Sequence, residues 1–362
     1  MKQLVRSPFA FIMISALLFG ISTPLAKLLL RDIPAVALAG LLYIGAFLGL
    51  SLYSVVRAKM SGSDIKAPSL ERKDLPWLAG AIVAGGIVGP ISMMMGLNLV
   101  SGFSASLLLN LEGVTTSAIA VFVFKENAGE RLWLALASMT VTGAFLTWDP
   151  TQGKFEIVGP LLLIFAMICW GIDNNLTRNL SEKDPVEVAA IKGLIAGTVS
   201  LSVALVLRVK MPLDLTIAFA LLLGSFSYGA SLVFFIKALE GLGSSRTGVF
   251  FSLAPFIGAV TSLILLREWI GWVMFPATGF MIVGVWLIMT ERHLHRHRHE
   301  TFVHTHLHNH TEMHHLHRHL GTIHEPHAHE HFHMEQTHSH VHWPDIHHRH
   351  KHGRNGDQFF CV

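Results

Sequence analysis

Long apolar stretches follow one another along most of the chain and are separated by short polar breaks. Each stretch is roughly 20 residues long, which is the length that a helix needs to cross ~30 Å of hydrocarbon. The stretches fall at 8–30, 34–56, 75–97, 102–124, 132–148, 157–177, 186–207, 214–237, 246–266 and 271–290. This pattern predicts an all-α integral membrane protein with ten transmembrane helices.

The two halves of this apolar region resemble each other. Three residues recur at one constant offset, with Gly20, Lys27 and Pro34 matched by Gly171, Arg178 and Pro185. The stretch Ser104–Glu126 is echoed by Ser245–Glu268. Because each half has an odd number of spans, the second copy lies upside down relative to the first, as in transporters with a midplane substrate site. We therefore expect two inverted five-helix repeats, over residues 1–150 and 151–291.

Composition supports a membrane protein and divides the chain in two. The sequence is 51% hydrophobic and 14% charged, and all 24 histidines lie between His293 and His352. Residues 292–362 therefore form a histidine-rich tail. The apolar part has no histidine for a catalytic triad and no phosphate-binding loop of the GxxxxGK[ST] type, so we expect neither an enzyme nor an ATP-driven pump.

The basic residues predict the orientation. The connection between residues 57 and 74 carries the largest cluster, with Arg57, Lys59, Lys66, Arg72 and Lys73. Short loops rich in lysine and arginine stay in the cytoplasm, so both termini and the tail are expected there. Since the basic residues lie in short loops, they are explained by membrane topology, and no nucleic-acid partner is expected.

Glu112 is the clearest candidate for transport chemistry. A carboxylate near the middle of a span costs roughly 2.5–3.5 kcal/mol on insertion scales, so it normally faces protein or a water-filled cavity. It could bind a cationic substrate or take up a coupling proton. The alternative is a structural ion pair with Lys192 or Lys237. Asn110, close by, is more simply explained as a hydrogen-bond donor between helices.

Other polar residues inside the predicted spans complete the candidate site. Ser22-Thr23-Pro24 interrupts the first span, and the sixth contains three consecutive polar residues, Asp173-Asn-Asn175. The full set of candidate substrate or coupling residues is Glu112, Asn110, Asp173, Asn174, Asn175, Thr23, Lys27, Arg178, Tyr228 and Ser252. Interfacial snorkelling explains Lys27 and Arg178 equally well, and Asp173 could instead form a local cap or pair with Arg178.

The tail repeats a His-x-His pattern with few apolar residues, so it is expected to be disordered. Neutral imidazole suits Zn²⁺, Ni²⁺, Co²⁺ and Cu²⁺. The candidate metal ligands are His293, His295, His297, His299, His304, His306, His308, His310, His327, His329, His331, His333, His347, His348, His350 and His352. The alternative is a solvated tail whose histidines become charged below about pH 6.5. No cofactor is required for the apolar region.

These features resemble the EamA-type members of the drug/metabolite transporter superfamily. The resemblance covers about residues 8–291 and rests on the duplicated layout, the Leu111-Glu112 centre of the fourth span and the ends of two spans, Lys125-Glu126 and Arg267-Glu268. Gly113 departs from the family, whose members often have proline after the acid. The resemblance implies an inner-membrane carrier, often an exporter of amino acids, metabolites or drugs, without specifying the substrate.

Three functions remain open from the sequence. The first is an exporter of a small metabolite or drug whose tail binds metal and regulates transport. The second is a transition-metal transporter for Ni²⁺, Co²⁺ or Zn²⁺ whose tail collects the ion, although the apolar spans lack histidine and clustered acids. The third is a membrane-anchored metal buffer or sensor. The expected partners are a small-molecule or ion substrate, the lipid bilayer and divalent metal ions, while monomer and homodimer remain equally open.

Overall fold

The computed structural model describes most of the apolar region and parts of the tail. The described residues are 8–60, 70–123, 130–149, 154–155, 157–180, 183–212, 214–268, 271–290, 293–299, 302–308, 327–333, 336–342 and 359–360. Among the predicted metal ligands, His310, His347, His348, His350 and His352 lie outside these ranges.

Up to residue 290 the described chain is almost entirely helical. The first half contains α1 (Pro8–Leu29), α2 (Ala35–Met60), η2 (Arg72–Asp74), α3 (Leu75–Ala81), η3 (Ile82–Val88), α4 (Gly89–Leu99), α5 (Gly102–Leu108), α6 (Leu111–Phe122) and α7 (Glu130–Thr147). The second half contains α8 (Val158–Thr177), η4 (Arg178–Leu180), α9 (Pro185–Val206), α10 (Leu215–Gly224), η5 (Ser225–Ala230), α11 (Ser231–Phe251), α12 (Ala254–Leu266) and α13 (Met274–Met289). The short strands β1 (Trp148–Asp149) and β2 (Lys154–Phe155) pair between the halves.

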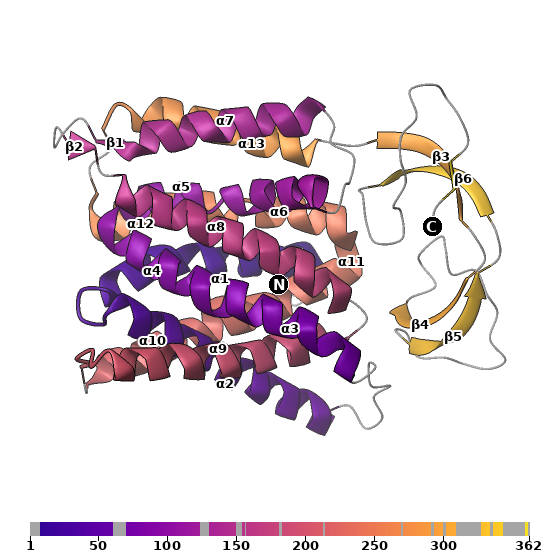
Figure 1. Ribbon diagram of the computed structural model, residues 1–362, viewed down its shortest axis with the longest axis horizontal. Coiled ribbons are helices and arrows are strands. Elements are labelled where there is room, and N and C mark those ends of the chain that lie inside the picture. The colour runs from indigo at the N-terminus through magenta and orange to yellow at the C-terminus, as the bar shows by residue number, and fades with distance from the viewer. Residues whose placement is uncertain are drawn as a thin grey trace.

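Several of these helices are long and apolar enough to cross a membrane. Within the described ranges, six segments meet that length and hydropathy: Pro8–Leu29, Ala35–Lys59, Arg72–Leu99, Val158–Thr177, Pro185–Val206 and Leu215–Ala238. Shorter apolar helices lie at Trp133–Thr142, Ala254–Leu266 and Met274–Leu287. Figure 1 shows the helices lying side by side in one bundle, with the tail strands beyond one end. The predicted helical membrane protein is confirmed at this level, and the count of ten spans stays a prediction.

Local sequence explains where two of the outer helices begin. Asp184 precedes Pro185 at the start of α9, and its side chain accepts a hydrogen bond from the Val186 amide at 2.8 Å. Asp214 caps α10 in the same way, accepting from the side chain and the amide of Thr216. These hydrogen bonds hold the pKa of Asp214 below its usual value. Both aspartates satisfy amides that the first helical turn leaves without partners.

The chain reverses direction within α11. The ring centroids of Phe235 and Phe251 lie 5.0 Å apart, whereas a straight helix would separate these positions by about 24 Å. Phe251 also lies 5.4 Å from Phe19 of α1. Helix α11 therefore joins the end of the predicted eighth span to the start of the ninth, and both pack against α1.

Small residues let α2 approach α10 closely. A methyl group added at Gly45 would lie 2.2 Å from the carbonyl oxygen of Leu221, and one at Gly224 would lie 2.1 Å from that of Leu42. Backbones that pack this closely are typical of membrane helices, which gain stability from van der Waals contact rather than from the hydrophobic effect.

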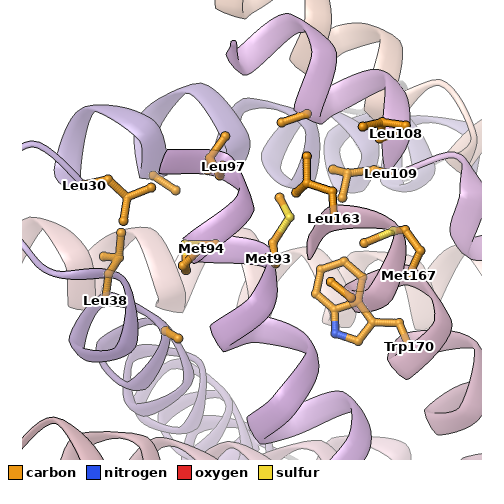
Figure 2. Packing of buried hydrophobic residues seen from close by; sticks show 14 of the residues in the cluster. Leu30, Leu38, Met93, Met94, Leu97, Leu108, Leu109, Leu163, Met167 and Trp170 are labelled. Atoms are coloured by element: carbon orange, nitrogen blue, oxygen red, sulfur yellow. The ribbon is translucent and has the colours of Figure 1, made fainter. Parts of the chain in front are cut away.

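The buried core joins the two halves. Met93, Met94 and Leu97 of α4 are almost fully buried. Figure 2 shows them between Leu30 and Leu38 on one side and Met167 with Trp170 of α8 on the other. Helix α4 thus packs its apolar side chains against both halves, and it holds α8, which carries the predicted polar residues, against the first half.

Within the tail the structure describes five short strands, and the disorder of the tail as a whole stays a prediction. Strand β3 (His293–His299) pairs antiparallel with β6 (Gln336–His342), and β4 (Phe302–His308) pairs with β5 (His327–His333). The two-residue β7 (Phe359–Phe360) runs parallel to β3. The His-x-His pattern has a period of two, which is the period of a strand. Composition predicts the lack of a buried core, but the alternating pattern also allows paired strands.

Candidate substrate and coupling site

Glu112 lies at a break between two helices. Helix α5 ends at Leu108 and α6 begins at Leu111, so Glu112 stands in the first turn of α6. The N-terminal end of a helix favours a negative charge. Glu112 is partly exposed, and its Oε1 accepts a hydrogen bond from Nδ2 of Asn174 at 2.9 Å. Glu112 and Asn174, which the sequence analysis listed as separate candidates, are therefore hydrogen-bonded to each other.

Asn174 and Thr116 connect α6 with α8 around this carboxylate. Nδ2 of Asn174 also lies 3.1 Å from Oγ1 of Thr116, which donates to the carbonyl oxygen of Glu112 at 2.7 Å. The donor that faces the Glu112 carboxylate is a neutral amide. No ion pair of Glu112 occurs among the residues that the structure describes.

Asp173 forms an ion pair with Lys192 of α9, and its Oδ1 accepts from Thr177 at 3.1 Å. The Asp173 side chain is 8% exposed and that of Lys192 is 18% exposed. From the sequence, one alternative for Glu112 is an ion pair with Lys192 or Lys237, and one alternative for Asp173 is a pair with Arg178. In the structure Lys192 pairs with Asp173 instead of Glu112, because α8 and α9 both pack against η3. The side chain of Arg178, in η4, lies outside the described residues.

Gly85 makes room for this ion pair. A methyl group at Gly85 would lie 1.9 Å from Oδ2 of Asp173. Gly85 belongs to η3, a π-helical segment, and such segments often occur at functional sites. Its carbonyl oxygen accepts hydrogen bonds from the Tyr43 hydroxyl at 2.7 Å and from Nε1 of Trp170 at 3.1 Å. Hydrogen bonds to the carbonyl oxygen of Gly85 thus connect α2 and α8 with η3.

Two tyrosines lie within electrostatic range of Glu112. The ring centroid of Tyr228, in η5, lies 6.1 Å from that of Tyr43 and 5.9 Å from that of Phe19. Each tyrosine interacts electrostatically with Glu112, and the Tyr228 hydroxyl also contacts that of Ser22. Tyr43 was not predicted. The signal was available, since the chain has only 3 tyrosines and this one interrupts an apolar span.

Other predicted residues have local or structural contacts. Nδ2 of Asn175 donates to the carbonyl oxygens of Thr116 and Gly171 at 3.0 and 2.9 Å, which clamps α8 to α6. Asn110 is buried at the break and donates to Leu107 at 3.3 Å, within its own segment rather than between helices. Thr23 is buried in α1. Ser252 lies at the break between α11 and α12.

Lys27 lies away from Glu112, at the opposite end of α4 from η3. Its Nζ donates to the carbonyl oxygens of Leu97, at 2.7 Å, and Val100. A cation is favourable at a helix C-terminus, where carbonyl groups lack partners. Lys27 therefore joins α1 to the end of α4, and its contact with substrate stays a prediction.

Glu268 ties the second half to the first near Lys27. Its two carboxylate oxygens accept hydrogen bonds from the amides of Gly102, at 2.6 Å, and Phe103, at 2.9 Å. Glu268 also interacts electrostatically with Lys27. In the sequence Glu268 marked only the end of a repeated stretch. In the fold, it links the segment that follows α12 to the start of α5.

We expect Glu268→Ala to lower the free energy of unfolding by about 1.5 kcal/mol. This is the lower end for hydrogen bonds to a charged group, since Glu268 is only partly buried. The midpoint of thermal unfolding in detergent measures the loss. Glu130→Ala, at the exposed start of α7, is the matched control and should leave the midpoint unchanged. Equal midpoints for both variants would contradict the assigned link.

Comparison with known proteins identifies the family. The model of the EamA-like transporter family matches this chain twice, over residues 7–148 and 157–290. The chain belongs to this family. Over 296 residues it is 26% identical to an uncharacterized transporter of Methanothermobacter thermautotrophicus, covering 76% of this chain and 84% of the relative. Over 239 residues it is 22% identical to the uncharacterized transporter YyaM of Bacillus subtilis, covering 62% and 74%.

A solved crystal structure shares the fold of this EamA-family chain. It superposes with a TM-score of 0.55 at 16% identity and covers 79% of this chain and 99% of its own. The family match over both halves confirms the resemblance to EamA-type permeases. The family and its named relatives make this chain a multi-pass membrane transporter, whose partners are a small-molecule substrate and the lipid bilayer.

Proposed function

We propose that this EamA-family protein is a secondary transporter that exports a small metabolite or drug across the inner membrane. The observation that carries the proposal is the position of Glu112, in the first turn after a helix break inside the predicted fourth span. Its carboxylate is held by the neutral amide of Asn174. A carboxylate in such a place can take up a proton or contact a cation, because none of the described lysines and arginines forms an ion pair with it.

Matching irregularities in the two halves support inverted repeats over 1–150 and 151–291. The third predicted span contains the π-helical η3 and the eighth contains the π-helical η5. The fourth breaks before Leu111 and the ninth breaks before Ala254. Discontinuous helices at corresponding positions are typical of transporters whose substrate site lies at the repeat interface. This arrangement supports ten spans and alternating access.

Contacts between the halves suggest how access alternates. With the termini in the cytoplasm, the hydrogen bonds from Gly102 and Phe103 to Glu268 lie on the outer side. The ion pair between Asp74 and Lys183, at 3.1 Å, lies on the inner side. In the proposed cycle, opening toward either side breaks the contacts on that side and keeps those on the other. Rocking of one repeat against the other is the usual form of this motion.

The histidine-rich tail acts in this proposal as a metal-binding regulator on the cytoplasmic side. A transition-metal transporter is the second candidate, and the tail is the feature that favours it. Among the described residues, no group of three or more His, Cys, Asp or Glu is placed to hold a metal ion. The apolar region therefore supports an organic substrate better than a bare metal ion.

The test uses cells that lack this protein and are complemented with the full chain or with residues 1–292. Metabolites in the medium are profiled by mass spectrometry, and growth and cell-associated metal are recorded with added Ni²⁺, Co²⁺, Zn²⁺ and Cu²⁺. We expect the full chain to raise one or more metabolites in the medium, and the truncated chain to do so without dependence on metal. A change in cell-associated metal with no change in metabolites would overturn export of an organic substrate.

A further inference from the structure

An apolar groove lies between the first helix and the start of the predicted eighth span. Five residues of α1, from Leu18 to Leu29, line one wall, and five residues of α10 and η5, from Phe219 to Ser227, line the other. Nine of these ten described side chains are apolar, and Ser227 is the exception. The groove has a volume of about 380 Å³. None of the ten residues belongs to the candidate site around Glu112 or to the contacts proposed to alternate.

The groove runs from the middle of the membrane to one surface. Leu18 and Ser227 line its deep end, near the centres of the predicted first and eighth spans. Next to them, the ring centroids of Phe19 and Tyr228 lie 5.9 Å apart. Leu29 is the last residue of α1 and lies at the end of the first span. The helix from Leu18 to Leu29 is about 16 Å long, which is the depth of one leaflet in a hydrocarbon core of ~30 Å.

One side of the groove opens to the surface of the helical bundle. Phe219, Leu222 and Phe226 are 61%, 52% and 55% exposed. They share one face of α10 and η5, because they are three and four residues apart. In a multi-pass membrane protein, an exposed apolar face at this depth lies against lipid tails. The groove is therefore continuous with the surface that the bilayer covers.

The chemistry of the walls favours a hydrocarbon chain as the occupant. Pockets for organic ligands usually carry a few polar groups that orient the ligand. Here the one polar residue among those that line the groove, Ser227, is 3% exposed and lies at the deep end. An empty groove would leave its lining atoms without van der Waals partners on one side. Lipid tails are as apolar as leucine and surround the protein at this depth, so a chain from the adjacent leaflet supplies those contacts.

We propose that this groove binds one acyl chain of a membrane phospholipid. The end of the chain lies near Leu18 and Ser227, and its ester lies near Leu29 and Phe219. The two walls belong to the two separate matches of the family model, so the bound chain packs against both halves of the protein and stabilises the contact of α1 with α10. The inference needs only the membrane class of the protein, and it holds whether or not the proposed export is correct.

The first test incorporates the full chain into vesicles of phosphatidylethanolamine and phosphatidylglycerol that contain a photoactivatable phospholipid. A diazirine stands either at the end of one acyl chain or near its ester, and the labelled residues are located by mass spectrometry. We expect the chain-end probe to label residues around Leu18 and Ser227, and the ester-end probe to label residues around Leu29 and Phe219. Each label should be at least fivefold stronger than at lipid-facing control positions of the same depth.

The control positions are Ile195 and Leu205 of α9, near the middle and the end of the predicted seventh span. They are 41% and 79% exposed, so ordinary contact with lipid labels them at the same two depths. Groove labelling no stronger than theirs would overturn the bound chain. Labelling of the same groove residues by both probes would overturn its extended position along the groove.

The second test fills the groove with a larger side chain. Leu25→Trp lies in the α1 wall, and we expect it to lower labelling of the α10 wall at least fivefold. Leu17→Trp is the matched control and should leave labelling unchanged, because Leu17 is 46% exposed on the same helix and is not among the lining residues. Leu222→Trp fills the groove from the opposite wall, so the test does not depend on the folding of one variant. Unchanged labelling in both filled variants would overturn the proposal.

The natural occupant is identified by native mass spectrometry of the full chain in nanodiscs formed directly from cell membranes. We expect the native chain and Leu17→Trp to retain a phospholipid that Leu25→Trp loses. A different apolar compound that only Leu25→Trp loses would assign the groove to a small-molecule ligand and overturn the lipid. Phospholipid retained equally by all three chains, or by none of them, would overturn it as well.

Discussion

Glu112→Gln is expected to reduce transport to the level of cells that lack the protein, while the chain still folds. Glutamine has the same size as glutamate and keeps a carbonyl oxygen that accepts the Asn174 hydrogen bond, which is 2.9 Å long in the native chain. The link between α6 and α8 is therefore preserved. The substitution removes the negative charge and the ability to take up a proton, which are the two properties that a coupling residue needs.

The measurement is the export rate of the metabolite that the complementation test identifies, with membrane abundance determined in parallel. Glu187→Gln is the matched control, because Glu187 lies exposed in the first turn of α9 and is far along the chain from the helix break. Native export by Glu112→Gln would show that Glu112 is structural. Loss of export with normal abundance, together with native export by Glu187→Gln, supports the coupling role.

Lys192→Met is expected to destabilise the protein by about 3–5 kcal/mol, because it leaves the buried carboxylate of Asp173 without its cation. Water cannot easily replace the lysine, since the Asp173 side chain is 8% exposed and faces Gly85. The double variant Asp173→Asn/Lys192→Met should recover most of the loss. Asparagine keeps the shape of aspartate and can still accept the hydrogen bond from Thr177, and neutral side chains often replace a buried ion pair at little cost.

Thermal unfolding in detergent and the yield of monodisperse protein measure this pair of changes. Lys210→Met, at an exposed position beyond α9, is the control for losing a lysine and should behave like the native chain. A harmless single variant would mean that the ion pair contributes nothing to the fold. A double variant as unstable as Lys192→Met alone would mean that Lys192 acts through contacts other than Asp173.

The sequence by itself determined the features that depend on local composition. Stretches of about 20 apolar residues can be stable in a bilayer only as helices, so the positions of the long helices and the membrane class followed without a structure. The duplicated Lys125-Glu126 and Arg267-Glu268 ends led to the family. Glu112 stood out because a carboxylate is rare and costly inside a span.

The tertiary structure alone decided which polar groups meet. Asp173 pairs with Lys192, a partner that the sequence did not indicate, and Tyr43 reaches the carbonyl of Gly85, since these contacts depend on which helices are neighbours. Spacing along a chain predicts contacts only within one helix, where residues three or four apart share a face. In the tail, a period of two permits a strand, but the pairing of His295 with His340 depends on where the chain turns back. Partners between elements are chosen by packing and strand register, which are properties of the whole fold.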